Sequence, residues 1–204
     1  LKDGKIIAAA EEERFRRIKH WAGFPSEAIR WCLQESDATL AEVGHVAINS
    51  DPKAQLLKKV SFSIKQRPDL KLILDRVRNR KERIGIEQEL ASSFPNESFS
   101  GKVYHVEHHL SHLASAHWGS SFSESVSISV DGFGDFSSAA WGLGNNESLS
   151  IDGRVLFPHS LGVFYQALTQ FLGFPKYGDE YKVMGLAPYG KPIYLNALRE
   201  ILKL

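Results

Sequence analysis

The sequence contains one cysteine, no long apolar run and almost no net charge, and each of these shortages excludes a class of protein. Cys32 has no second cysteine to pair with, so the chain forms no internal disulfide, which fits a reducing compartment. No apolar stretch approaches the ~20 residues that a membrane-spanning helix needs. A formal net charge of +1 gives no general attraction to nucleic acid or to a membrane surface. We therefore expect a cytoplasmic globular protein, with neither a membrane nor a nucleic acid as its partner.

Histidine, by contrast, is concentrated in one segment, with four imidazoles between residues 105 and 112. On a helix over 106–118, His105, His108 and His112 lie on one face. The opposite face carries Val106, Leu110, Leu113 and His117. Because His108 and His112 are one helical turn apart, two neutral imidazoles reach one divalent metal. Two other interpretations stay open, a solvated polar face or a single histidine that satisfies a hydrogen bond in the core.

The segment after this helix alternates strictly between serines and branched apolar residues, which predicts a β-strand over 125–130. We expect its apolar side to face a core: Val126, Ile128 and Val130. The strand ends in Asp131-Gly132-Phe133-Gly134-Asp135, and residues 137–143 predict the return strand. Glycines permit a tight turn, backbone N–H groups grip phosphate oxygens, and a carboxylate takes a cation. An ordinary hairpin turn is the alternative.

The first twenty residues predict a turn, a strand and a charged segment. Residues 1–5 indicate the turn of a hairpin, and residues 5–10 predict a short strand. The charged run 11–20 has two interpretations. It forms a solvated face with local ion pairs, each worth under ~1 kcal/mol. Alternatively, it points Arg14, Lys19 and His20 into a cleft that holds an anion.

Strands and helices alternate along much of the remaining chain, which indicates an α/β layer. The predicted elements are a helix that opens at 24–26, strands over 43–49, 101–105, 149–151 and 154–157, and a helix that opens at 158–162 and ends at Gly173. Residues 178–190 form a glycine-punctuated loop that carries Lys182. This loop lacks the Gly-Lys-Ser/Thr ending of a Walker A sequence.

Residues 53–83 form a basic excursion with eleven Lys or Arg and three Asp or Glu. Apolar residues recur there at helical spacing, and Pro68 separates two predicted helices. The segment is an exposed helical excursion with a basic outer face, or it is a docking surface for an acidic partner or a phosphate-rich ligand. Phe62 is its only aromatic residue, which argues against single-stranded nucleic acid.

Taken together, these segments resemble the O-carbamoyltransferase family that acts in nodulation-factor and antibiotic biosynthesis. The resemblance covers nearly the whole chain in the family's order, except for residues 53–83. It is carried by Asp3-Gly4-Lys5, the run from Glu11 to His20, Gly23-Phe24-Pro25, His108-x-x-x-His112, Val130 to Asp135, Pro158 to Gly162, and Lys182 to Gly190.

The resemblance implies an α/β actin-like ATPase fold, similar to the tRNA threonylcarbamoyl transferases, in which two ribonuclease-H-like lobes enclose a nucleotide. Residues 1–122 would form the first lobe without its first strand, and residues 123–204 the start of the second. The fold would therefore be incomplete. We expect a fragment of a longer protein that also has a YrdC-like domain, and we expect this fragment alone to be inactive.

By the same resemblance, the whole protein would transfer a carbamoyl group from carbamoyl-adenylate, made from carbamoyl phosphate and ATP, to the hydroxyl of a small acceptor. His108, His112 and Asp131 would bind a divalent metal, most often iron, with zinc or manganese as alternatives. The residues lining the nucleotide phosphates would be Asp131, Gly132, Gly134, Asp135 and Lys182. Lys19 matches a family lysine near the transfer site and would be catalytic.

Two rival functions stay open. One is a metal-dependent hydrolase, although the segment from His108 to His112 lacks the glutamate that zinc peptidases place after the first histidine. The other is a lobe that binds a metal or nucleotide without turnover.

Overall fold

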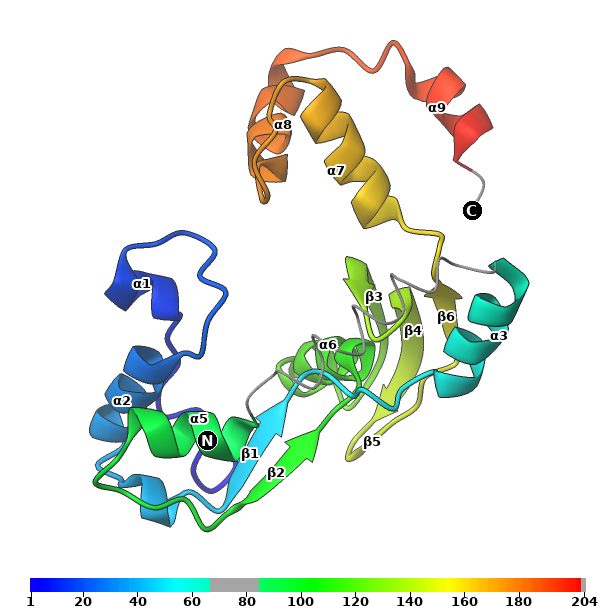
Figure 1. Ribbon diagram of the computed structural model, residues 1–204. Coiled ribbons are helices and arrows are strands. Elements are labelled where there is room, and N and C mark those ends of the chain that lie inside the picture. The colour runs from blue at the N-terminus through cyan, green and yellow to red at the C-terminus, as the bar shows by residue number, and fades with distance from the viewer. Residues whose placement is uncertain (67–84, 203–204) are drawn as a thin grey trace.

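The computed structural model describes residues 1–66 and 85–202 and shows helices arranged around two sheets (Figure 1). The smaller sheet is a parallel pair, β1 (His45–Ile48) and β2 (Lys102–His105), in which Val46 lies opposite Val103. The larger sheet is antiparallel, with β4 paired to the other three strands. Its strands are β3 (Glu124–Gly134), β4 (Ser137–Asn145), β5 (Ser148–Leu149) and β6 (Gly153–Leu156). The predicted α/β character and the main predicted strands are thus confirmed, although β5 overlaps the range 149–151 at one residue only.

A small apolar core lies beside the parallel pair. It joins α2 (Ser26–Glu35), the 3-10 turn η1 (Leu40–Glu42) and α5 (Ile86–Ser93). The centre consists of Leu40, Leu90 and Phe94, none more than 3% exposed. Phe24, Ile29, Leu33, Val43, Ile86 and Phe99 pack around it. The helix predicted from residues 24–26 is confirmed, whereas α5 was not expected from the sequence.

The strand predicted over residues 5–10 is absent from the described structure, and this expectation was wrong. Lys2 and Lys5 form one isolated antiparallel bridge around a turn in which Asp3 and Gly4 have φ of 52° and 76°. The predicted turn is therefore confirmed. No strand among the described residues pairs with 6–10, so the backbone there gains no ladder hydrogen bonds. The short helix α1 (Glu12–Arg16) follows.

The basic excursion begins with α3 (Leu56–Gln66), which confirms the first of its two predicted helices. The second predicted helix, after Pro68, lies outside the described residues. Phe62 attaches α3 to the larger sheet, because its ring centroid lies 4.9 Å from that of Phe157 and 5.8 Å from that of Phe136. The other apolar side chains of α3 are exposed: Leu56, Leu57, Val60 and Ile64.

Strand β3 alternates as predicted, but the expectation that its apolar side faces a core was wrong. Val126, Ile128 and Val130 are 58–69% exposed, whereas Ser127 and Ser129 are 4% and 7% exposed. The serine face is covered by α6 (His108–Trp118), as Figure 1 shows. On α6 the buried side chains are His109, Leu113 and His117, so the helix is also rotated from the apolar face predicted for it.

The chain ends in a helical arm formed by α7 (Leu161–Phe171), α8 (Glu180–Leu186), the 3-10 turn η2 (Ala187–Tyr189) and α9 (Leu195–Ile201). The predicted helix near 158–162 is confirmed, with Ser160 as its N-cap and Gly173 beyond its end at φ 92°. The expectation of a loop over 178–190 was wrong, because α8 lies there. None of the described helices has both the length and the apolar character needed to cross a bilayer.

Candidate functional site

The first turn of α6 is fixed by two carboxylates that accept hydrogen bonds from its backbone. Glu107 is the N-cap, and its Oε2 accepts from Leu110 N–H at 2.8 Å and from Arg154 Nη2 at 3.1 Å. Asp135 Oδ2 accepts from His108 N–H at 2.9 Å and from Asp51 N–H at 2.7 Å. The start of α6 is therefore held against the end of β1 and the turn between β3 and β4.

The buried face of α6 is fixed by two imidazole–hydroxyl hydrogen bonds to β3. His109 Nδ1 lies 2.9 Å from Ser129 Oγ, and His117 Nδ1 lies 2.7 Å from Ser125 Oγ. The facing residue of β4 is Gly144, where a Cβ would overlap the His117 ring. Small residues and hydroxyl groups thus let the helix lie close to the sheet and give each buried imidazole a hydrogen-bond partner at Nδ1, whereas His109 Nε2 has none among the described residues.

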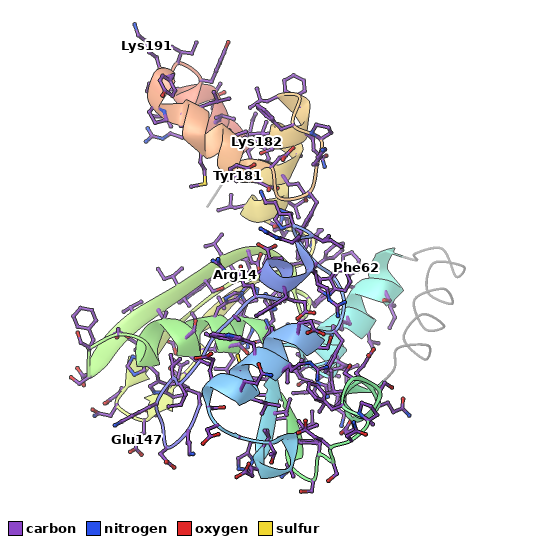
Figure 2. The ribbon with its side chains drawn as sticks, turned by 90° about the vertical axis from the view of Figure 1, so that its left-hand side faces the viewer. Arg14, Phe62, Glu147, Tyr181, Lys182 and Lys191 are labelled. Carbon is purple, nitrogen blue, oxygen red and sulfur yellow. The ribbon has the colours of Figure 1, made fainter. Side chains whose placement is uncertain are left out.

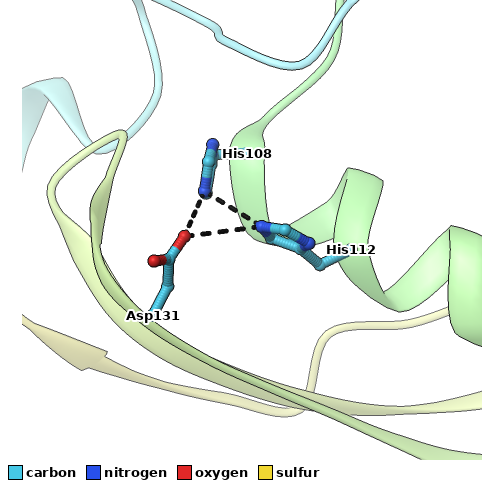
Figure 3. Close-up of side chains that lie close together, drawn as sticks. All are labelled: His108, His112 and Asp131. Carbon is cyan, nitrogen blue, oxygen red and sulfur yellow. Dashed lines mark hydrogen bonds and ion pairs between the residues drawn. The ribbon is translucent and has the colours of Figure 1, made fainter. Parts of the chain in front are cut away.

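With α6 placed in this way, the three predicted ligands converge (Figure 3). His108 Nε2 lies 2.8 Å from Asp131 Oδ2, and His112 Nε2 lies 3.1 Å from His108 Nε2. The third side of the triangle, from His112 Nε2 to Asp131 Oδ2, is 3.5 Å. The two imidazoles come from adjacent turns of one helix, and the carboxylate comes from a strand. His105 is not in this group, since it ends β2 and its Nδ1 contacts Ser50 O at 2.9 Å.

The triangle has the dimensions of a metal-binding face. Ligand atoms at about 2.1 Å from one metal lie about 3.0 Å apart at right angles and about 3.4 Å apart at the tetrahedral angle. The observed separations of 2.8, 3.1 and 3.5 Å span this range. Two imidazoles and one carboxylate on one face, with positions left open, form a donor set known for Fe(II) and also suited to zinc. The residues present therefore fit a divalent metal.

Asp131 is held in its ionised form. Burial alone would raise the pKa of its carboxyl, but the hydrogen bond from His108 and that from Gly132 N–H, at 2.6 Å, lower it below its ordinary value. The nearby imidazoles lower it further. An ionised carboxylate is the form that binds a cation.

The two glycines at the end of β3 differ in their surroundings. A Cβ on Gly134 would overlap the ring of His108, whereas a Cβ on Gly132 would have no heavy atom within 4 Å. Gly134 therefore provides the space that His108 needs to reach Asp131. That both glycines line nucleotide phosphates stays a prediction.

Asp135 has a structural task that sequence reasoning missed. Its Oδ2 accepts one backbone hydrogen bond from α6, at His108, and one from Asp51, and its Oδ1 lies 3.2 Å from the Ser50 hydroxyl. The side chain thus joins the end of β1 to α6 and to the turn. That it also lines a nucleotide phosphate stays a prediction, and these hydrogen bonds leave its carboxylate little capacity for a further ligand.

The two lysines predicted as site residues line a second candidate site, apart from the metal triangle. Lys19 and Lys182 line one cavity of about 540 Å³, together with His20, Lys176, Tyr177, Asp179 and Tyr181. Lys19 Nζ lies 4.1 Å from the centre of the Tyr181 ring, and Lys182 Nζ lies 2.6 Å from Asp179 Oδ1. Arg14, on the exposed side of α1, does not line this cavity. Sequence reasoning did not single out Lys176. Lys176, Asp179 and Lys182 follow one another at intervals of three residues, and this spacing was a usable signal.

Known proteins match this chain over almost its full length. The family model described as Carbamoyltransferase N-terminus matches residues 1–203. The nodulation protein NolNO of Sinorhizobium fredii is 35% identical, over 94% of this chain and 27% of its own length. The uncharacterized protein sll1178 of Synechocystis sp. is 33% identical, over 97% of this chain and 33% of its own length. The chain thus spans about a third or less of these curated relatives.

A shorter match gives the same family. The nodulation protein NolO of Bradyrhizobium diazoefficiens is 43% identical over 43% of this chain and 16% of its own length.

Proposed function

Because the chain belongs to the carbamoyltransferase family, of which it matches the N-terminal domain, we propose that it supplies the metal centre for ATP-dependent carbamoyl transfer to a hydroxyl group. The observation that carries this proposal is the triangle of His108, His112 and Asp131, whose ligand atoms lie within 4.8 Å of one another. The donor for the transfer would be carbamoyl-adenylate, made from carbamoyl phosphate and ATP. The acceptor would be a small molecule of secondary metabolism or nodulation-factor biosynthesis.

The proposed fold is the actin-like ATPase fold, with residues 1–122 in one ribonuclease-H-like lobe and residues 123–204 in the other. Two observations support this division. The parallel pair lies wholly in the first part and the antiparallel sheet wholly in the second. The metal triangle takes its imidazoles from the first part and its carboxylate from the second, as expected of a site between two lobes.

The metal would be held by His108, His112 and Asp131, with iron favoured over zinc or manganese by the two-histidine, one-carboxylate donor set. When bound, a divalent cation polarises a carbonyl or phosphate oxygen and offsets negative charge that develops there. The protein's own part is to keep the Asp131 carboxyl ionised and to hold α6 close enough to β3 for the imidazoles to reach it.

The transfer itself is a substitution at the carbamoyl carbon. The acceptor hydroxyl oxygen bonds to that carbon, and the bond from the carbon to the adenylate phosphate oxygen breaks, which releases AMP. The hydroxyl proton passes to a base, and we assign none on this chain. Lys19 would act as a catalytic cation near the reacting groups, and Lys182 would face the nucleotide phosphates. Both ammonium groups line the same cavity.

The expected partner within the whole protein is a YrdC-like domain that makes the carbamoyl-adenylate. A cytoplasmic location follows from the need for ATP. The rival function is a lobe that binds metal or nucleotide without turnover.

The test uses the full-length protein and measures AMP formed from ATP and carbamoyl phosphate in the presence of an acceptor hydroxyl. We expect wild type and His105→Ala to release AMP and His112→Ala to lose most of this activity. Equal rates in the two variants would contradict the proposal. If the wild type binds ATP and metal by calorimetry but makes no carbamoylated product with any acceptor, the binding lobe is the better account.

A further inference from the structure

The segment from Pro158 to Gly162 carries part of the family resemblance, yet none of its residues belongs to the metal triangle. Its last residues form the N-cap and first turn of α7, which begins beside the end of β3 (Figure 1). We propose that Ser160 and Gly162 are positioning residues for the carboxylate of Asp131. The inference deepens the proposed function and rests on it for the metal that this carboxylate would bind.

Asp131 lies in a part of β3 that β4 does not hold. The paired residues run as far as Val130 opposite Ala139, and pairing resumes only at Gly134 opposite Ser137. This step covers four positions on β3, from 130 to 134, and two on β4, from 139 to 137. Irregularities of this kind re-aim side chains and interrupt the ladder locally. Since no residue of β4 is paired with residues 131–133, another element must fix the backbone there.

The hydroxyl of Ser160 supplies a contact that the ladder lacks. Its Oγ donates to Gly132 O at 2.7 Å and lies 3.2 Å from Asp131 O. The same oxygen is the N-cap of α7 and accepts from a backbone N–H of that helix at 3.0 Å. The segment is also held from β4, because Ser138 Oγ donates to His159 O at 2.6 Å. The start of α7 is thereby joined to the backbone that carries the carboxylate.

Gly162 lets α7 approach this backbone closely. A Cβ at position 162 would lie 2.5 Å from Asp131 O and 2.7 Å from Gly132 N. Both are backbone atoms, so they cannot rotate away as the end of a side chain can. Gly132 N–H donates to Asp131 Oδ1 at 2.6 Å, while the other carboxylate oxygen, Oδ2, lies 2.8 Å from His108 Nε2. A shift of this peptide group therefore moves the carboxylate relative to the imidazoles.

The backbone conformation of Gly162 does not itself require glycine, since its φ is not positive. Within a helix, alanine is more favourable than glycine by about 1 kcal/mol. Glycine at this position thus weakens α7 and gains close contact with Asp131. A role in packing alone predicts a more stable helix with alanine, whereas a positioning role predicts a displaced carboxylate.

The test compares Gly162→Ala with Gly185→Ala, each before and after addition of cobalt. Gly185 lies in α8, the helix that carries Tyr181 and Lys182 in Figure 2, and a Cβ there would have no heavy atom within 4 Å. Both substitutions raise helix propensity equally, so only the approach to Asp131 differs. Without metal, the nitrogen chemical shift of His108 Nε2, measured by NMR, reports its contact with the carboxylate.

We expect Gly185→Ala to keep the wild-type nitrogen shift and cobalt affinity. Gly162→Ala changes the shift and binds cobalt about tenfold more weakly. Ser160→Ala makes the same test without added bulk, and Ser160→Thr, which keeps the hydroxyl, restores both readings. The proposal is overturned if Gly162→Ala matches Gly185→Ala in both readings, or if Ser160→Ala matches the wild type. If the wild type binds no cobalt but the nitrogen shifts differ as expected, the metal centre fails and the positioning role stands.

Discussion

Gly134 is the residue whose size matters most directly to the site. The His108 ring occupies the space that a Cβ at position 134 would fill, and that ring makes the 2.8 Å contact with Asp131. Gly132, two residues earlier in the same strand, has open space at the corresponding point. Neither glycine has a positive φ, so the backbone conformation itself disfavours a side chain at neither position.

We therefore expect Gly134→Ala to displace His108 and to weaken binding of a divalent metal such as cobalt by tenfold or more, about 1.4 kcal/mol. Gly132→Ala is the matched control, and its metal affinity stays near that of the wild type. Titration of the apoprotein, followed by absorbance, measures both. Equal affinities for the two variants would show that the ring moves aside at no cost.

Glu12 is a buried carboxylate with a stability role at the start of the chain. Its oxygens accept from Ala28 N–H at 2.7 Å, Arg16 Nε at 2.8 Å and Glu27 N–H at 3.3 Å. Burial alone would raise the pKa of Glu12, but these hydrogen bonds lower it below its ordinary value of 4.5. The ionised side chain thus joins α1 to the first turn of α2.

A lowered pKa in the folded state means that Glu12 stabilises the fold fully above pH 4.5 and loses this contribution as the pH falls through the folded-state value. Glu12→Gln is expected to reduce the free energy of unfolding at pH 7 by about 1–3 kcal/mol, since it removes a charged acceptor. Urea unfolding between pH 7 and pH 3 measures the effect. We expect the difference in the free energy of unfolding between wild type and variant to become smaller in acid. A difference that stays constant with pH would contradict this role of Glu12.

At the scale of elements, the packing of α6 on β3 depends on imidazole–hydroxyl pairs. Ser129→Ala leaves His109 Nδ1 buried without its hydroxyl partner, which costs about 1–3 kcal/mol in the free energy of unfolding. Ser121→Ala, in the exposed turn after α6, is the control and has little effect. Denaturant melts of both variants decide the point. A Ser129→Ala variant as stable as the control would mean that His109 Nδ1 finds another hydrogen-bond partner.

These same pairs explain where sequence reasoning succeeded and failed. The alternation over 125–130 predicted the strand, and the spacing of His108 and His112 predicted which imidazoles meet, since both signals are local. Which side of the strand would be covered was not a local property. It was decided by a helix whose buried histidines need hydroxyl partners, so Ser129 lies inside and Ile128 outside.

Long-range contacts also account for the other elements that were missed. The expected strand over 5–10 has no neighbouring strand to pair with in the described structure. The helix α5 is held in position because Leu90 packs against Leu40, which lies fifty residues earlier in the chain. The cavity lined by Lys19 and Lys182 exists only because the segment after α7 lies against residues 19 and 20. Spacing within any one segment carries none of this information.

At the scale of the whole molecule, the metal triangle joins the two parts of the chain that hold the two sheets. A cation bound there would contact α6 and β3 together and would bind the folded protein alone, because the unfolded chain does not bring the three ligands together. Binding to the native state alone raises stability by mass action. The account therefore predicts that metal increases the temperature of unfolding in the wild type but not in His112→Ala.

The central claim is that His108, with His112 and Asp131, binds one divalent cation, and elemental analysis of purified variants tests it most directly. The comparison is between His108→Ala and His105→Ala, which remove neighbouring histidines from different elements, only one of which lies in the triangle. We predict about one metal ion per wild-type chain, a similar content in His105→Ala, and little metal in His108→Ala. Equal metal content in the two variants would contradict the account.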